Sequence, residues 1–506
     1  MKGRDLLWES VRQTLVRVLI VDLNNFSRYP TMSVGYAAAI LRRQGMEVEV
    51  FSPLSVGVPS YPRKTRPKPW GLIDHGLRYW SGTTRSQTIR KLRQELVHRV
   101  RPTNDDATRK IIVGAEEAMT RGADVVLVSA YTMYFDVCSE LCKIAAREGI
   151  PIAIGGPYFS QPEIIEEWLT IPGLTALMGG ELESYVTELV KGLAEGRDVT
   201  PLAGVSCPGK PAAGAAPPVI DLDQIPFPDY SDFPWNSYPN RIIPMLAGRG
   251  CGWGVCTFCS DVVTSSGRGF RSRSAQNVLE EMRHQHEQHD SRLFYFLDLK
   301  LNSDSSVWKA LAEQTQSIVP GAAWTASVHV GLGEKEGLSY EELKVARQSG
   351  LVRMTTGLES GSTQVLAAMA KGTDPEVTSR FLRDAHQAGI TMRLTTIIGY
   401  PGEEPDDVLA TAKFLERHQE YVDRIVLSPF ALQLGTPFQR RFATRPERFP
   451  AISEATLNLR TATFDHVNST FHGIHHRKAA FKLLKVIHRI NRKPHTRYSR
   501  EFDGVM

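Results

Sequence analysis

Strands and helices alternate along most of this chain, in two blocks that a proline-rich segment separates. In the first block, apolar runs of strand length, such as VRVLIVDL (16–23) and ADVVLVSA (123–130), are each followed by a segment with helical spacing. Strands that alternate with helices pair in parallel and are covered by helices on both faces of the sheet. The chain is therefore predicted to be an α/β protein, and its 506 residues are enough for more than one domain.

The proline-rich segment predicts the main domain boundary. Residues 207–240 contain CPGKPAAGAAPP and IPFPDYSDFPWNSYP, and this density of proline predicts an extended linker on the surface, since proline interrupts regular elements. Residues 1–206 then form a Rossmann-like domain, with an excursion at 58–103, and residues 441–506 form a basic, helical C-terminal region. Residues 241–440 are predicted to form a partial (β/α)6 barrel; its strand candidates are 242–248, 293–299, 322–328, 352–359, 391–399 and 423–430.

Composition narrows the functional classes. The net charge of +5 is small for this length and does not suggest a nucleic-acid binder. No apolar run is long enough for a transmembrane segment, and the N-terminal residues do not have the pattern of a signal peptide. These features predict a cytoplasmic protein with no transmembrane segment and no nucleic-acid partner.

Three of the six cysteines fall within nine residues. Cys251, Cys256 and Cys259 occur in GRGCGWGVCTFCSD, directly after the first predicted strand of the barrel. Thiolates at short spacing hold iron–sulfur clusters, and the loop glycines let the backbone fold around an inorganic cube. Three thiolates leave one iron of a cubane open, and that iron can chelate the amine and carboxylate of an amino acid.

Other interpretations of the cysteines remain open from the residues alone. A zinc knuckle with a distant histidine, or three unrelated core cysteines, would also give a triplet. Cys138 and Cys142 share one helix face and are predicted to be buried small side chains. Trp253, inside the cysteine loop, could gate a pocket or simply pack.

With these motifs the chain resembles the radical S-adenosylmethionine superfamily, in particular its branch with a cobalamin-binding domain. The family loop is usually C-x3-C-x2-C, whereas RGCGWGVCTFC has one more residue between the first two cysteines. The resemblance spans about residues 15–440. It implies a 4Fe-4S cluster on Cys251, Cys256 and Cys259, next to S-adenosylmethionine.

The resemblance also implies contacts with S-adenosylmethionine. They lie in FYFLDLKLNSD, in RMTTGLESGSTQVLAAMAKGT and in TMRLTTIIGYPGE. Asp298 would meet the methionine amine, Glu359 the nucleoside or amine, and Gly399 and Gly402 the adenosine. Phe258 and Arg393 complete the implied cofactor-binding set in this half.

The first domain resembles the cobalamin-binding domain of the same branch. Four loops would converge at the carboxyl edge of its sheet, where ligands bind doubly wound folds. Ser129, Gly155, Gly156 and Gly180 are the implied contacts. The Asp-x-His-x-x-Gly motif, which supplies a cobalt ligand in many cobalamin proteins, has no counterpart here. A domain that binds a substrate, or no cofactor, is the alternative.

The resemblance implies an enzyme that forms a 5′-deoxyadenosyl radical and methylates an unactivated carbon of a secondary metabolite. Its partners would be a small-molecule substrate and an external electron donor such as flavodoxin or ferredoxin. A radical cyclase or rearrangement enzyme without methyl transfer is the first alternative, and a cobalamin- or redox-sensing binding protein is the second. A methylthiotransferase is disfavoured, since no additional N-terminal cysteine set occurs. The basic tail is expected to form a solvated helix over the barrel, with docking of an acidic partner, a phosphorylated substrate or a membrane surface as the other options.

Overall fold

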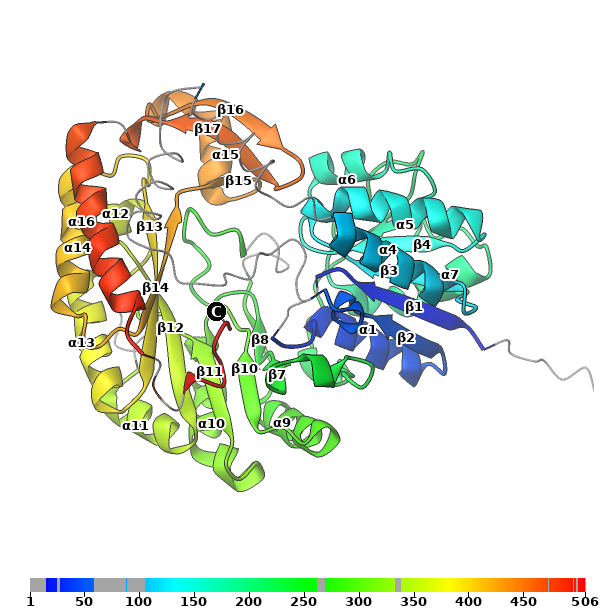
Figure 1. The fold of residues 1–506 in the computed structure, drawn as a ribbon, viewed down its shortest axis with the longest axis horizontal. Helices are drawn as coiled ribbons and strands as arrows, with labels where there is room; N and C mark the ends of the chain where they lie inside the picture. Colours follow the sequence, from blue (N-terminus) through cyan, green and yellow to red (C-terminus); the bar gives the residue numbers. More distant parts are fainter. Residues whose placement is uncertain are drawn as a thin grey trace, which may run out of the picture.

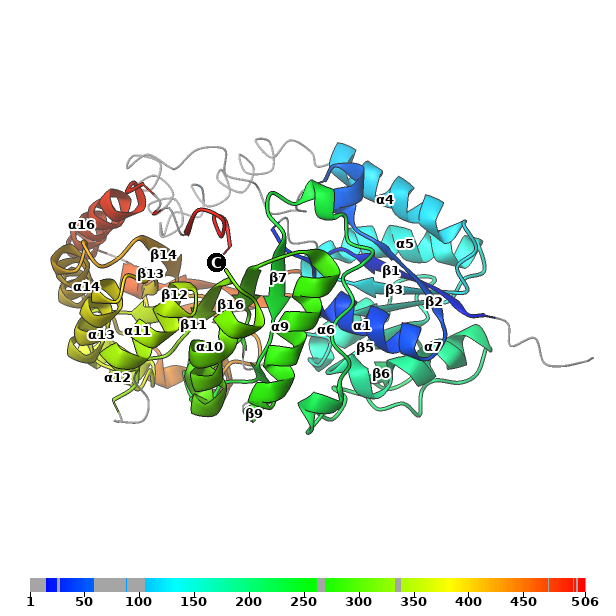
Figure 2. The ribbon, with the colours of Figure 1, turned by 90° about the horizontal axis from the view of Figure 1, so that it is seen from below.

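The structure is a computed structural model that describes residues 15–24, 28–58, 88, 105–261, 269–332, 338–471, 473–494, 496 and 499–505. The N-terminal segment, nearly all of the predicted excursion, and His472 and His495 of the tail lie outside these residues. Two six-stranded sheets lie side by side, each with its own helices (Figure 1). The view from below shows both domains again, with α9 (Ala275–His289) of the second domain beside the first (Figure 2).

The first sheet has the order β2-β1-β3-β4-β5-β6, and every pair in it is parallel except β5–β6. Its strands are β1 (Arg17–Asp22), β2 (Glu47–Phe51), β3 (Val125–Ser129), β4 (Ile152–Gly155), β5 (Ala176–Met178) and β6 (Val205–Ser206). The helices among the described residues of this domain are α1 (Met32–Arg43), α4 (Asp105–Met119), α5 (Phe135–Arg147), α6 (Pro162–Trp168) and α7 (Val186–Ala194). The predicted Rossmann-like alternation is confirmed, with one antiparallel strand added at the edge.

Residues of β1 alternate between two cores, as the pleat of a strand requires. Val18 and Ile20 pack with residues of α1 and α7, whereas Leu19 and Val21 pack with residues of α4, α5 and α6. The sheet is thus buried on both faces, which explains why its strands read as continuous apolar runs.

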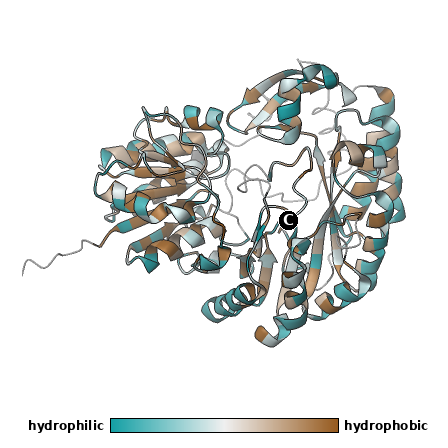
Figure 3. Ribbon diagram, turned by 180° about the vertical axis from the view of Figure 1, so that it is seen from behind, coloured by the Kyte–Doolittle hydropathy of each residue, from teal (hydrophilic) through white to brown (hydrophobic). Residues whose placement is uncertain are grey.

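The second sheet is parallel throughout and has the order β7-β10-β11-β12-β13-β14. Its strands are β7 (Ile242–Met245), β10 (Leu293–Phe296), β11 (Ala323–Ser327), β12 (Leu351–Glu359), β13 (Thr391–Ile398) and β14 (Arg424–Pro429). The helices around it are α9, α10 (Ser305–Ile318), α11 (Tyr340–Gln348), α12 (Thr363–Ala368), α13 (Pro375–Gln387) and α14 (Pro405–Arg417). All six strand predictions are confirmed. Figure 3 shows the strands largely brown and the outer faces of these helices largely teal.

The C-terminal region contains more than the predicted helix. The helix α16 (Ile474–Asn491) covers α14 and β14, which is the ordinary outcome expected for the basic tail. Before it, β16 (Ile452–Asn458) and β17 (Thr463–Asn468) form an antiparallel hairpin with the short strand β15 (Leu432–Gln433), next to α15 (Pro437–Thr444). None of the described helices combines the length and the apolar composition needed to cross a membrane.

The end of the chain returns to the barrel. Phe502 and Val505 are buried against the first residues of the barrel strands, such as Ile242. The guanidinium of Arg353 donates to the Ser499 and Phe502 carbonyls at 2.5 and 2.7 Å. This segment therefore fills the end of the barrel opposite the carboxyl ends of the strands.

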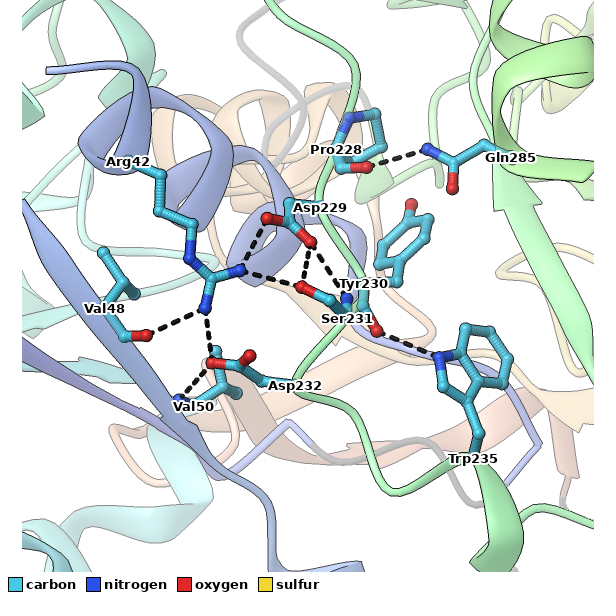
Figure 4. Close-up of polar contacts among 10 residues, drawn as sticks. All are labelled: Arg42, Val48, Val50, Pro228, Asp229, Tyr230, Ser231, Asp232, Trp235 and Gln285. Atoms are coloured by element: carbon cyan, nitrogen blue, oxygen red, sulfur yellow. Dashed lines mark hydrogen bonds and ion pairs between the residues drawn. The ribbon is translucent and has the colours of Figure 1, made fainter. Parts of the chain in front are cut away.

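The proline-rich linker is the predicted surface segment only in its first half: most of residues 207–221 are exposed, whereas the aromatic residues of the second half are buried. Tyr230, Phe233 and Tyr238 are buried in the core that includes residues of both domains. Arg42 of α1 holds the segment through Asp229 at 2.5 Å and Asp232 at 2.7 Å, and Trp235 Nε1 donates to the Tyr230 carbonyl (Figure 4). The aromatic residues between the prolines bury apolar area, so the linker joins the domains rather than separating them.

Candidate functional site

The cysteine loop lies at the carboxyl end of the barrel sheet, where reactive groups of such folds occur. All three cysteines are partly exposed. The backbone N–H of Thr257 donates to the Met369 carbonyl at 2.9 Å, and the indole N–H of Trp253 donates to the Ala370 carbonyl at 2.9 Å. The loop is thus fixed to the turn after α12.

Gly372 shows why this turn is specific. It has a φ of +69°, and a Cβ at this position would lie 2.2 Å from the Trp253 ring. Only glycine lets the indole pack this closely. Trp253 therefore packs against the loop's support, which answers the question that the sequence left open for it.

Burial and a nearby positive charge shift the pKa of a thiol in the loop in opposite directions. Burial raises the pKa of Cys256, and the ammonium of Lys371 opposes that shift. Among the described residues, no three Cys, His, Asp or Glu side chains converge as closely as the ligands of a single metal ion. A cubane places its three thiolates on three different irons, so the partly exposed, glycine-rich triplet fits a cluster without such convergence.

Lys371 and Glu359 form a buried ion pair beside the loop. Their side chains are 10% and 7% exposed, and Lys371 Nζ lies 3.1 Å from Glu359 Oε1. Burial lowers the pKa of Lys371, but Glu359 and the thiols of Cys256 and Cys259 outweigh it, so the net shift is upward. Phe258 packs its ring 5.9 Å from the ammonium. The ammonium of Lys371 therefore faces the thiols of Cys256 and Cys259.

His329 follows β11 and stacks on Trp253, with ring centroids 5.8 Å apart. Its Nε2 lies 2.8 Å from the Lys371 carbonyl, so this nitrogen carries the hydrogen. Burial, followed by the charge of Lys371, lowers the pKa of His329 to about 4. The ring is therefore neutral near pH 7. The sequence analysis did not predict a role for His329 or Lys371. His329 directly follows the predicted strand 322–328, and Lys371 lies in the motif after the strand 352–359; these positions were the available signals.

Asp298, predicted to contact the methionine amine, lies just after β10, the second barrel strand. Asp298 is buried, and its two oxygens accept from the backbone N–H groups of Ala247 and Gly248 at 3.0 and 2.7 Å. Burial raises the pKa of Asp298 to about 6, against these two hydrogen bonds. The carboxylate thus anchors the strand that leads into the cysteine loop, and its contact with the methionine amine stays a prediction.

The predicted residues of β13 divide between its two ends. The Gly399 N–H donates to Glu403 at 2.6 Å, and the Gly399 carbonyl accepts from Asn468 at 2.7 Å. Gly402 has open space around it. Arg393 lies near the start of the strand and donates to the Val505 carbonyl, so the structure places it on the C-terminal segment, away from Gly399.

The four residues predicted for the first domain come together. Ser129, Gly155, Gly156 and Gly180 line one cavity of about 590 Å³ at the carboxyl edge of the first sheet. A Cβ on Gly156 would lie 1.9 Å from the Ala130 carbonyl oxygen, so glycine is required for β3 and the turn after β4 to approach. The described lining contains no Lys, Arg, His, Asp or Glu.

The cavity and the cysteine loop are neighbours. Tyr158 lines the cavity, and its hydroxyl bonds the side chain of Ser260, the residue after Cys259. Leu297, directly after β10, lines the cavity from the barrel side. Arg249, two residues before Cys251, pairs with Glu183 of the first domain at 2.5 Å. The two predicted cofactor sites thus face each other across the domain boundary.

The structure thus joins a partial barrel, with a cysteine triplet at its mouth, to a Rossmann-like domain. The Radical SAM superfamily matches residues 245–415. The chain therefore contains a Radical SAM domain over these residues.

Known proteins match a longer part of the chain than this family model does. An uncharacterized methyltransferase of Pyrococcus horikoshii is 27% identical over 319 residues, 61% of this chain and 67% of that protein. A Methanocaldococcus jannaschii protein named as a methylthiotransferase is 23% identical over 312 residues, 58% of this chain and 65% of that protein.

Two solved structures share the fold. The methyltransferase TsrM from Kitasatospora setae, solved with cobalamin and a [4Fe-4S] cluster, has a TM-score of 0.62 and 16% identity, covering 94% of this chain and 91% of TsrM. The cobalamin-dependent enzyme OxsB, solved with aqua-cobalamin and S-adenosylmethionine, has a TM-score of 0.65 and 16% identity, covering 90% of this chain and 64% of OxsB. At this identity the comparison establishes the two-domain fold.

Proposed function

We propose that this chain is a cobalamin-dependent radical SAM methyltransferase that methylates an unactivated carbon of a small-molecule secondary metabolite. The observation that carries the proposal is the neutral cavity of the first domain, which opens beside the cysteine loop through Tyr158. A methyl carrier must lie next to the place where the substrate is activated, and the two sites have that relation. Both solved relatives were determined with a corrin bound.

The cavity favours cobalamin over a dinucleotide. Dinucleotides bring a pyrophosphate, which Rossmann folds bind at a helix N-terminus with a glycine-rich turn. The described lining of this cavity contains no Lys or Arg, and its apolar side chains include Ile20, Leu127 and Met178. A volume of about 590 Å³ fits a nucleotide-sized group, so the cavity could hold the uncharged base and ribose of the cobalamin tail.

When bound, the cluster supplies the electron that cleaves S-adenosylmethionine to methionine and a 5′-deoxyadenosyl radical, and cobalamin supplies the methyl group. The residues of this chain would bind the cluster and orient S-adenosylmethionine. Cys251, Cys256 and Cys259 would hold the cluster, and the Lys371–Glu359 pair offers opposite charges for a zwitterionic amino-acid group. Trp253 and His329 stack on each other beside the loop and support it.

The test is anaerobic reconstitution with iron, sulfide and hydroxocobalamin, followed by incubation with S-adenosylmethionine carrying a deuterated methyl group and a chemical or flavodoxin reductant. We expect 5′-deoxyadenosine, and we expect a retained corrin spectrum after gel filtration. Turnover to 5′-deoxyadenosine without corrin retention would instead favour the cyclase or rearrangement enzyme. A retained corrin without any 5′-deoxyadenosine would favour the sensing protein.

The similarity to a protein named as a methylthiotransferase does not extend to a second cluster site. Of the three cysteines outside the loop, Cys138 and Cys142 are fully buried in the core of α5, and Cys207 follows β6. Burial raises the pKa of both α5 thiols, Cys142 to about 12. These are features of structural cysteines rather than of metal ligands.

A further inference from the structure

At the carboxyl end of β1, the buried oxygens Asp22 Oδ1 and Asn24 Oδ1 have no hydrogen-bond partner of good geometry among the described residues, and the buried Thr31 hydroxyl makes only a weak contact, with the Asp22 carboxyl. The three residues are 1%, 6% and 4% exposed. A buried polar group left without a partner costs about 1–3 kcal/mol, so native proteins rarely keep one without a use. Asn24 and Thr31 line the cavity of the first domain.

The local geometry leaves these atoms open as acceptors. The amide nitrogen of Asn24 donates to the Ser129 hydroxyl at 3.0 Å, which fixes the side chain and leaves its oxygen without a donor. Thr31 is the N-cap residue of α1, where threonine usually accepts a hydrogen bond from the first turn of the helix. Its hydroxyl makes no such bond. The chain thus forgoes a helix cap that this residue type would normally provide.

The charge of this corner selects the kind of group that fits. Burial raises the pKa of Asp22 to about 7, so its carboxyl carries less than a full charge at neutral pH. The cavity's described lining has no cation that would hold an anion. An acceptor-rich corner without a cation suits N–H or O–H donors of an uncharged group and repels phosphate.

We propose that Asp22, Asn24 and Thr31 form an acceptor subsite that binds neutral N–H or O–H donors of the ligand in the first domain. This inference rests on the proposed function, in which the ligand is cobalamin. Its neutral donors are the primary amides on the corrin rim and the ribose hydroxyl of the nucleotide tail. The phosphate of the tail would lie away from this corner.

The test compares Thr31→Val with Thr175→Val, since valine keeps the shape of threonine and removes only the hydroxyl. Thr175 is the control because its hydroxyl is satisfied, accepting from the Ile152 N–H at 3.0 Å. Hydroxocobalamin binding to the apoprotein is measured by equilibrium dialysis, and Tm is measured without ligand. For Thr31→Val we expect a Kd about 3- to 10-fold higher and a smaller loss of apoprotein Tm than for Thr175→Val, because the Thr31 hydroxyl makes only a weak contact, with the Asp22 carboxyl. For Thr175→Val we expect a lower Tm and an unchanged Kd.

Asn24→Ala is the second variant, and it is also expected to raise the Kd. Cobinamide, which keeps the corrin amides but lacks the nucleotide, distinguishes the two donors. Weaker binding of both corrinoids assigns the rim amides, and weaker binding of hydroxocobalamin alone assigns the ribose. Unchanged binding in folded Thr31→Val and Asn24→Ala would overturn the subsite while leaving the proposed function intact. If the wild-type protein binds no corrin, the proposed function fails, and the subsite fails with it.

Discussion

The two sites that face each other across the domain boundary have opposite electrostatic character. The cavity of the first domain has a described lining without Lys, Arg, His, Asp or Glu. The mouth of the barrel holds a buried Lys371–Glu359 pair, three thiols and the neutral ring of His329 within one loop and its support. One site therefore selects its ligand by shape and neutral hydrogen bonds, and the other by charge and metal ligation.

The difference has a physical reason. A charged group buried in protein needs a partner, because its desolvation costs several kcal/mol. The barrel mouth meets this need with opposite charges fixed on two adjacent structural elements, β12 and the turn after α12. The cavity avoids the cost by using apolar and neutral polar side chains and backbone, which suits a large ligand that binds intact.

The largest effect is expected from loss of a cluster ligand. Cys256→Ala should abolish the broad iron–sulfur absorbance near 400 nm and the formation of 5′-deoxyadenosine, because two thiolates do not hold the cluster stably. The matched control is Cys138→Ala, which removes a fully buried thiol of the first domain. The control should keep its iron content and lose only stability. Equal iron content in both variants would contradict the assignment of the loop.

The next largest effect is expected from Lys371→Met. This change leaves Glu359 buried without its partner, which typically costs about 3–5 kcal/mol of stability. It also removes the positive charge beside Cys256, so binding of S-adenosylmethionine should weaken. The double variant Lys371→Met with Glu359→Gln should recover part of the stability, measured by urea unfolding, but not the affinity. Full recovery of both would mean that the pair is only structural.

Much of the fold could be predicted from the sequence, because its signals are local. The apolar runs of β1, β3 and β4 and all six barrel strands lie where the periodicity places them. The hairpin of β16 and β17 was not predicted, since its residues are largely half-exposed and polar, and such strands lack clear alternation. The burial of Tyr230 and its neighbours also escaped prediction, because proline content indicates the absence of regular structure but not where a segment packs.

The candidate sites also contain some features that the sequence predicts and others that it does not. The cysteine loop and the small residues of the cavity follow from motifs, and the cavity residues do come together. Pairings between distant segments do not follow from motifs. The Lys371–Glu359 pair, the backbone contacts of Asp298 and the bond from Arg393 to the chain end depend on tertiary structure. A residue's type and strand were predictable, but its partner was not.

A third prediction concerns Asp22, the buried last residue of β1, two residues before Asn24 of the cavity lining. Burial raises the pKa of Asp22 to about 7, above its ordinary value. The folded protein therefore binds this proton more tightly than the unfolded chain, and stability contributed by the protonated form is lost as pH rises from about 4 to 7. Asp22→Asn apoprotein should be more stable than wild type at pH 8, by at most about 4 kcal/mol, and the difference should vanish near pH 4. A difference in unfolding free energy that does not change with pH would show that Asp22 has an ordinary pKa.

The smallest effect is expected at the linker that keeps the two sites opposite each other. Arg42 binds Asp229, Ser231, Asp232 and the Val48 carbonyl (Figure 4), but its side chain is 27% exposed, so solvent screens the ion pairs. Arg42→Met should cost about 1–2 kcal/mol and expose the 207–240 segment to limited proteolysis, with a smaller effect at 1 M salt. Arg43→Met, on the exposed face of the same helix, is the control and should change neither. If the linker of Arg42→Met were cleaved no faster than that of Arg43→Met, the buried aromatic residues rather than the ion pairs would hold the domains together. Apolar packing would then keep the neutral cavity opposite the charged mouth of the barrel.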